Sequence, residues 1–217
     1  MQTLSELIKA GDAEGVRRML DKNPEVLESE SAEAPSWLLL ALYYGQAGVA
    51  DAIRQYRPKL TIFEASAMGD RHALDAILAQ DPSAHAQVSS DGFTPLGYAA
   101  YFGHYEVLRA LLDAGADPSV PSQNPMGVLP LHSALSSGHK EVARLLIDRG
   151  TDVNAASAEG WTPLHYAAHN GDIETAKYLL DHHAKREVLT REGKSPADLA
   201  EERGFSDLGE LLRPVGA

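Results

Sequence analysis

Residues 160–168 read Gly160-Trp161-Thr162-Pro163-Leu164-His165-Tyr166-Ala167-Ala168. Related segments recur at intervals of 33 to 35 residues, and these are Asp91-Gly92-Phe93-Thr94-Pro95-Leu96-Gly97-Tyr98-Ala99-Ala100, Gly127-Val128-Leu129-Pro130-Leu131-His132-Ser133-Ala134 and Gly193-Lys194-Ser195-Pro196-Ala197-Asp198-Leu199-Ala200. A series of seven glycines, separated by 34, 24, 34, 35, 33 and 33 residues, extends this spacing over the chain: Gly11, Gly45, Gly69, Gly103, Gly138, Gly171 and Gly204. Such a spacing indicates a tandem array, in which one small unit stacks on copies of itself.

Each segment predicts a pair of short helices. Thr94, Thr162 and Ser195 can each cap a helix whose first turn holds proline, where the missing amide proton costs nothing. Leu129 stands at the equivalent place and supplies no hydroxyl cap. Each first helix is expected to end at its glycine, and a second begins directly after it, with apolar residues at helical spacing such as Val107, Leu108, Leu111 and Leu112.

This pattern resembles the ankyrin repeat, in which two antiparallel helices are followed by an extended turn that leads to the next Thr-Pro-Leu-His. Thr162-Pro163-Leu164-His165 is an unbroken match, and Leu129-Pro130-Leu131-His132 is a partial one. Gly115-Ala116-Asp117 and Asp152-Val153-Asn154-Ala155 resemble the segment that closes a unit. The resemblance is strong from Asp91 to about Leu212 and weaker before Asp91. The pattern, which includes Phe93-Thr94-Pro95-Leu96-Gly97 and Asn124-Pro125-Met126, is similar to that of ankyrin-repeat proteins of bacterial type.

The expected fold is therefore all-α, a single ankyrin-repeat solenoid over residues 1–217 with about seven helix-pair units, including N- and C-terminal caps. The units cover roughly 1–34, 35–60, 61–91, 92–126, 127–159, 160–192 and 193–217. Polar outer faces on the first and last pairs are what terminal repeats need, which favours a complete array.

Two intervals depart from the repeat length. The 24-residue interval between Gly45 and Gly69 leaves no room for an extended turn, so two helices joined to the next unit by a tight connection are expected. The 35-residue interval has two extra residues around 122–126, which should lengthen one turn.

Composition limits the function classes. The apolar fraction of 44% suffices for a sizeable core, and the formal charge of −12 argues against nucleic-acid binding, which needs clustered Lys and Arg. A charged partner would carry a basic patch. The chain has no cysteine, and its longest apolar run is eight residues, whereas about 20 are needed to span a bilayer. A cytoplasmic monomer without contact to membranes is the expectation.

Motifs for catalysis or cofactor binding are absent from the sequence. No phosphate-binding glycine loop or nucleophile elbow occurs, so no catalytic residue and no cofactor are predicted. His165 and His169 are four residues apart, yet no third metal ligand is evident, and the ankyrin resemblance implies that His132 and His165 form hydrogen bonds between adjacent units. An unrecognised hydrolase stays open as an alternative, because a tight Ser–His–carboxylate cluster in the folded chain would revive it.

The candidate binding residues are large or polar side chains near the glycines and the Thr-Pro dipeptides, positions that line one concave face in a stack of this kind. They are Tyr101, Phe102, Phe93 and Trp161 as anchors, His169 and Asn170 as polar contacts, and Tyr44 and Met68. Glu159 and Glu192 would add acidic steering at the rim. Exposed aromatic residues are frequent interface anchors. Against this, Tyr44 could fill space in the short unit and Met68 could be core filler.

The function expected from these features is a non-catalytic scaffold or adaptor that binds a protein or peptide on the concave face. The alternative is regulatory binding of a sugar or metabolite in the aromatic groove. A compact pocket among Tyr43, Tyr44, Met68 and Tyr101 would favour the small molecule, and a long open groove would oppose it.

Overall fold

The computed structural model describes residues 2–29 and 34–214, and within them every regular element is helical. The first helices of the pairs are α1 (Leu4–Ala10), α3 (Trp37–Tyr43), α5 (Ile62–Met68), α7 (Pro95–Tyr101), α9 (Pro130–Ser136), α11 (Pro163–His169) and α13 (Pro196–Glu202). The second helices are α2 (Ala13–Lys22), α4 (Ala47–Tyr56), α6 (Arg71–Gln80), α8 (Tyr105–Asp113), α10 (Lys140–Asp148), α12 (Ile173–Asp181) and α14 (Ser206–Leu212). Two short 3-10 helices follow α2 and α6, namely η1 (Pro24–Ser29) and η2 (Pro82–Ala86).

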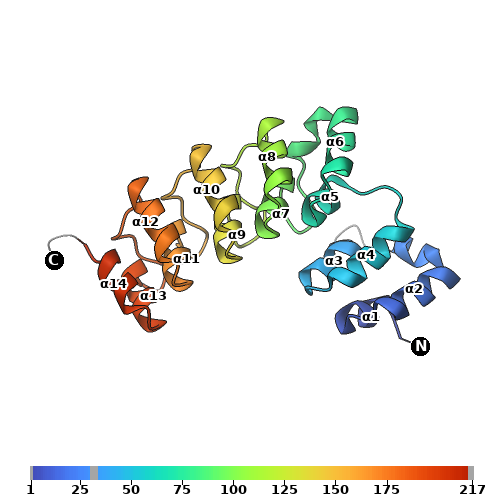
Figure 1. Ribbon diagram of the computed structural model, residues 1–217, viewed down its shortest axis with the longest axis horizontal. Helices are drawn as coiled ribbons and strands as arrows, with labels where there is room; N and C mark the ends of the chain where they lie inside the picture. Colours follow the sequence, from blue (N-terminus) through green and yellow to red (C-terminus); the bar gives the residue numbers. More distant parts are fainter. Residues whose placement is uncertain (1, 30–33, 215–217) are drawn as a thin grey trace.

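The pairs stack in sequence order into an elongated solenoid, from α1 and α2 at one end to α13 and α14 at the other (Figure 1). Each first helix from α3 to α11 contacts the first helix of the next pair, and the buried side chains of neighbouring pairs form one continuous core. The prediction of an all-α solenoid is confirmed. The expected units 1–34 and 193–217 include residues 30–33 and 215–217, which lie outside the described residues.

The glycines at the ends of the first helices are held by two constraints. All seven have φ between 70° and 83°, a left-handed conformation that side chains avoid. In several units the next unit also packs on the glycine: a Cβ on Gly69 would lie 2.5 Å from Nδ1 of His104, and one on Gly103 would lie 2.4 Å from Nδ1 of His139. The turn between the helices therefore requires glycine in each unit, and the stacking of units requires it as well where the next unit lies on the glycine, as at Gly69 and Gly103.

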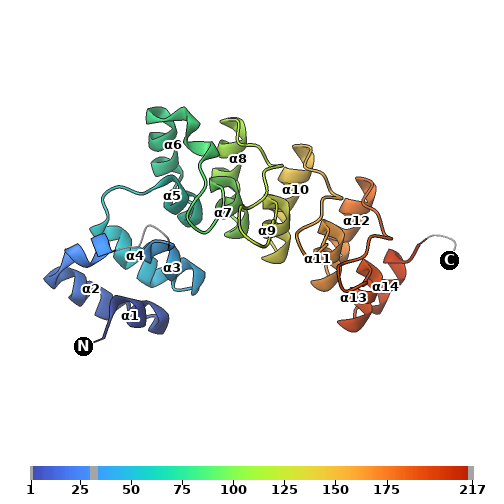
Figure 2. The same cartoon turned by 180° about the vertical axis from the view of Figure 1, so that it is seen from behind.

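The short second unit is closed by a buried carboxylate. After α4 ends at Tyr56, only residues 57–61 lead to α5, as expected for the tight connection. Glu64 on α5 is 0% exposed and accepts hydrogen bonds from the Thr61 backbone N–H at 2.8 Å and the Ser36 hydroxyl at 2.7 Å. Its other partner is the Arg57 guanidinium at 3.0 Å. This network replaces the missing turn and joins the start of α3, the connection and α5. The path of the connection from α4 to α5 can be followed in Figure 2.

The Thr-Pro-Leu-His histidines are buried and fully hydrogen-bonded. Nδ1 of His132 and of His165 each accepts a backbone N–H, from Leu129 and Thr162 respectively, both at 3.0 Å. Their Nε2 atoms then donate to backbone carbonyls, His132 to Ala155 at 3.0 Å and His165 to Lys194 of the following unit at 3.2 Å. The expected bond between units is thus formed by His165, whereas His132 braces the turn of its own unit.

The predicted capping is right in two of three helices. Thr94 accepts the Gly97 N–H at 3.1 Å, and Ser195 accepts the Asp198 N–H at 3.2 Å. Thr162 differs from the prediction, since its hydroxyl pairs with Nδ1 of His165 at 2.8 Å and caps no backbone amide. The histidine competes for the hydroxyl because it stands three residues into the helix.

Burial of these histidines predicts acid sensitivity. Burial lowers the pKa of His132 to about 4 and also lowers the pKa of His165 and of His104, so these three rings bind protons less readily in the folded state than in the unfolded chain. The unfolded chain takes up protons below about pH 6.5, so the free energy of unfolding should fall as the pH drops from about 6.5 towards 4. His132 alone should contribute about 2–3 kcal/mol of this loss. Urea unfolding at a series of pH values should show a shallower loss for His132→Gln, and parallel curves would contradict the assignment.

Alanine at two of these glycines separates the contact with the next unit from the cost of the left-handed backbone. Gly45 and Gly103 have φ of 70° and 77°, but a Cβ on Gly45 meets nothing within 4 Å, whereas one on Gly103 meets the His139 ring. Both alanine variants should lose about 1 kcal/mol for the left-handed backbone. Gly103→Ala should lose roughly 1–3 kcal/mol more, because the His139 ring must move. Equal losses in chemical denaturation would show that stacking on the glycine contributes nothing.

Candidate functional site

Two hollows lie side by side along the solenoid, between the extended turns and the first helices. The first compartment has a volume of about 550 Å³ and is lined by Pro35, Tyr43, Asp91, Phe93, Gly97, Tyr98, Tyr101, Asn124, Pro125 and Met126. The second compartment has a volume of about 510 Å³ and is lined by Pro125, Met126, Val128, Ser136, Ser157, Glu159, Trp161, Tyr166, His169 and Asn170. Pro125 and Met126 line both, so the turn that carries them divides one groove into two parts.

The first compartment is bounded by the two places where the chain departs from its repeat. On one side the short second unit has no extended turn, and Tyr43 from α3 reaches the turn at Asp91, donating its hydroxyl to Oδ2 at 2.7 Å. On the other side lie Asn124, Pro125 and Met126 from the turn with two extra residues. Asn124 holds this turn in place, because its Nδ2 donates to the Asp91 carbonyl at 2.9 Å and its Oδ1 accepts the Met126 N–H at 3.0 Å.

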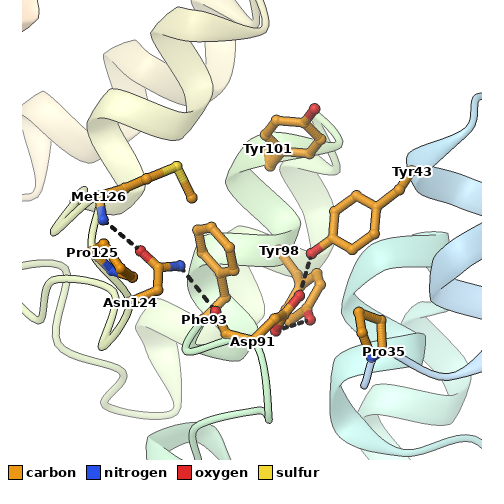
Figure 3. Close-up of a pocket in the computed structure, with 10 residues that line it drawn as sticks. Pro35, Tyr43, Asp91, Phe93, Tyr98, Tyr101, Asn124, Pro125 and Met126 are labelled. Atoms are coloured by element: carbon orange, nitrogen blue, oxygen red, sulfur yellow. Dashed lines mark hydrogen bonds between the residues drawn. The ribbon is translucent and has the colours of Figure 1, made fainter. Parts of the chain in front are cut away.

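Three hydroxyl groups converge on the Asp91 carboxylate. Besides Tyr43, the Tyr98 hydroxyl donates to Oδ1 at 2.6 Å (Figure 3). The Ser89 hydroxyl donates to the same oxygen. Burial raises the pKa of Tyr43 and of Tyr98 above the usual value for a phenol, and the neighbouring carboxylate adds to the effect. Both hydroxyls therefore stay protonated and continue to donate at any physiological pH.

Aromatic rings surround this carboxylate. The Tyr98 ring is buried and lies between Phe93 and Tyr43, with centroid distances of 5.9 and 6.3 Å. Tyr101, 40% exposed, packs edge-on against Tyr43 at 6.2 Å. In the close-up, Phe93 and Tyr43 stand on opposite sides of Tyr98, and Tyr101 lies above them (Figure 3). The compartment thus presents aromatic rings around a single acidic group.

The second compartment is built around Trp161. Its ring packs against Tyr166 at 5.1 Å and edge-on against His169 at 5.4 Å. Asn170 uses its Nδ2 to donate to the Leu135 carbonyl of the preceding first helix at 2.7 Å, a bond that ties α11 to α9. Glu159 stands at the rim with its side chain exposed.

The structure places five of the eight predicted binding residues in these compartments. Phe93 and Tyr101 line the first, and Trp161, His169 and Asn170 line the second. The other three line neither: Phe102 packs half-buried against Tyr43 and His104, Tyr44 lies exposed with Lys9 Nζ 6.0 Å from its ring, and Met68 packs half-buried against the main core. Of the two predicted rim carboxylates, Glu159 lines the second compartment and Glu192 lines neither.

Sequence reasoning did not select Asp91, Tyr98, Asn124 or Met126 as site residues. Their roles depend on contacts with segments that lie far away in the chain, as in the Tyr43–Asp91 bond between residues 48 positions apart. A signal was available for Asn124 and Met126, because both stand in the turn that the 35-residue interval lengthens.

The histidines form no metal centre with other ligands in the described part of the chain. Among residues 2–29 and 34–214, no group of three or more His, Asp or Glu side chains is arranged to hold a metal ion. Both ring nitrogens of His165 are already hydrogen-bonded.

None of the helices in residues 2–29 and 34–214 has the length and apolar character needed to cross a bilayer.

The Tyr43–Asp91 bond can be tested with a neighbouring residue as control. Tyr43→Phe keeps the ring contacts and removes one donor from a partly buried carboxylate, so the free energy of unfolding should fall by about 1–3 kcal/mol. Tyr44→Phe removes an exposed hydroxyl one residue away and should leave stability within about 0.5 kcal/mol of the parent. The comparison is made by urea denaturation followed by circular dichroism, and equal stabilities of the two variants would contradict the role of the bond.

Comparison with known proteins agrees with this architecture. Residues 62–122 and 131–180 match the family model described as ankyrin repeats (many copies). A stretch of 63 residues is 44% identical to a probable E3 ubiquitin-protein ligase, XBOS31, of Oryza sativa subsp. japonica. That match covers 29% of this chain and only 14% of the rice protein, so it concerns a small part of the relative. The family model matches more than half of the chain, over segments whose helix pairs, glycine turns and buried histidines have the repeat geometry, and the chain therefore belongs to the ankyrin-repeat family.

Proposed function

We propose that this chain is a non-catalytic interaction module that holds a segment of a protein partner in the groove formed by the two compartments. Ankyrin repeats are in general protein-interaction domains, which supports the class of function. The observation that carries the proposal is Met126, a 51% exposed thioether on a lengthened turn that walls both compartments. Folding alone does not require a large apolar side chain at such an exposed place.

The groove is preorganised for recognition. Its walls are helices and turns fixed by the bonds of Asp91, Asn124 and Asn170 to neighbouring units. A rigid receptor loses little conformational entropy on binding, so more of the contact energy appears as affinity. Each compartment has room for a large side chain of the partner, and the net charge of −12 together with Glu159 at the rim favours a basic segment.

The small-molecule alternative has weaker support. A sugar needs free donors and acceptors, whereas the polar side chains of the first compartment are hydrogen-bonded to one another. The compact pocket expected for a metabolite would include Tyr44 and Met68, which line neither compartment. A hydrolase is not proposed, because no hydrogen bond joins a serine to a histidine among the residues that the structure describes.

The ligase activity in the name of the rice relative is not transferred to this chain, since the similarity covers so little of that protein. We extend the proposal to a scaffold or adaptor role and to a monomeric state. We also propose that the protein lies in the cytoplasm, which the absence of cysteine supports because disulfides are rare in reducing compartments. The partner we propose is a protein with a basic segment, rather than a nucleic acid or a membrane.

Two double variants of matched exposure test the proposal. Tyr101→Ser with Met126→Ser removes two exposed apolar side chains from the groove, and Ile173→Ser with Leu189→Ser removes two of similar exposure that line neither compartment. Interface anchors commonly contribute more than 1 kcal/mol each, so the groove variant should lose at least tenfold in partner binding. Trp161 is less suitable as a target because its ring also packs on Tyr166 and His169.

The measurement is quantitative capture from a lysate of the source organism with each variant as bait, followed by titration of the captured protein. Circular dichroism and thermal unfolding establish that both double variants are folded. The proposal is wrong if the groove variant retains the partner while the control pair loses it, or if both variants bind as the parent does.

A further inference from the structure

The first compartment combines π faces with a single negative charge. Phe93, Tyr43 and Tyr101 stand around the buried Tyr98 ring, and the Asp91 carboxylate lies at the base between the Tyr43 and Tyr98 hydroxyls (Figure 3). No Lys, Arg or His is among the described residues that line it. The charge of Asp91 is therefore not neutralised by a basic side chain within the compartment.

The hydrogen-bonding capacity of the compartment is largely used up. The Asp91 carboxylate accepts hydrogen bonds from three hydroxyl groups. The Asn124 side chain forms hydrogen bonds through both its amide nitrogen and its carbonyl oxygen. The two tyrosine hydroxyls donate to Asp91, so they are not free to donate to a ligand. A ligand here meets ring faces and an electrostatic field, and finds few partners for N–H or O–H groups.

These conditions select among possible ligand groups. A neutral apolar group would gain from the rings and nothing from the carboxylate. A primary ammonium would be attracted, but it would give up water bonds to three N–H donors that the compartment cannot replace. A methylated ammonium keeps the positive charge and has few or no N–H donors, and its methyl groups pack on aromatic faces.

We infer that the first compartment binds a methylated or quaternary ammonium group, with Asp91 supplying the charge and Tyr43, Phe93 and Tyr101 the aromatic walls. This inference rests on the proposed function, because the group that we infer is a methylated lysine side chain of the protein partner. A free quaternary ammonium compound presents the same chemistry. The Tyr43–Asp91 bond has a positioning role, since it holds one wall against the acid across the short unit.

The test uses a cation and its neutral isostere. Choline and 3,3-dimethylbutan-1-ol have nearly the same shape and differ in the charge on the branched centre. NMR titration of the ¹⁵N-labelled full chain should give choline an affinity at least about tenfold higher, with shifts centred on Gly92, Phe93 and Tyr101. Equal affinities of the two compounds, or no shifts in the first compartment with either, would overturn the inference.

Variants assign the effect to individual residues. Asp91→Asn keeps the size of the side chain and removes its charge, so the preference for choline over the neutral isostere should fall several-fold, to the smaller preference that the aromatic rings alone give. Tyr101→Leu keeps an apolar wall and the Asp91 network but removes a π face, so choline binding should weaken several-fold even if Asp91→Asn proves unstable. Leu189→Ser, at an exposed residue that lines neither compartment, should leave choline binding unchanged. Unchanged preference in both Asp91→Asn and Tyr101→Leu would also overturn the inference.

A second pair of probes identifies the source of the group. Nα-acetyl-Nε-trimethyl-lysine methylamide should bind more tightly than its unmethylated counterpart. Tighter binding of this amide than of choline indicates a methylated side chain, and the reverse order indicates a free quaternary compound, both in support of the inference. Tighter binding of the unmethylated amide contradicts it. If no methylated ligand binds, the proposed function is still tested independently by the two double variants, because that comparison of partner capture does not depend on a methylated ligand.

Discussion

The fold depends on a left-handed turn after each first helix. Unless the chain reverses there, the second helix cannot pack beside the first, and only glycine adopts φ of 70° to 83° without strain. Some of these glycines also leave space for the neighbouring unit, as His104 on Gly69 and His139 on Gly103 show. A single residue type thus satisfies the path of the chain within a unit and the contact between units.

The candidate site arises where this regularity is broken. The second unit lacks an extended turn, and Tyr43 and Pro35 border the space on that side. The unit that ends at Met126 has two residues more than the unit that follows it, and its turn forms the opposite wall. A regular stack would place equivalent turns at equal intervals, so a deletion and an insertion on either side of the turn at Asp91 create a hollow that the repeat itself does not contain.

Asp91 links the stability of the solenoid to the chemistry of the groove. Its bond to Tyr43 crosses from the second unit to the turn before α7, and its backbone carbonyl anchors Asn124 of the next turn. Three hydroxyl donors stabilise the carboxylate, and no basic side chain lines the compartment among the described residues. The residue that joins three units is therefore also the source of negative potential where a ligand would bind.

The sequence by itself determined the helix pairs, their order and the family, because capping residues, prolines and glycines act within a few residues of where they stand. It also located both irregular intervals. Only the tertiary structure decided which aromatic residues face the groove: Phe93, Tyr101 and Trp161 line it, whereas Phe102, Tyr44 and Met68 do not. The joining of Tyr43 to Asp91 could not be predicted, because that contact depends on how the short unit displaces α3 relative to a turn 48 residues further along the chain.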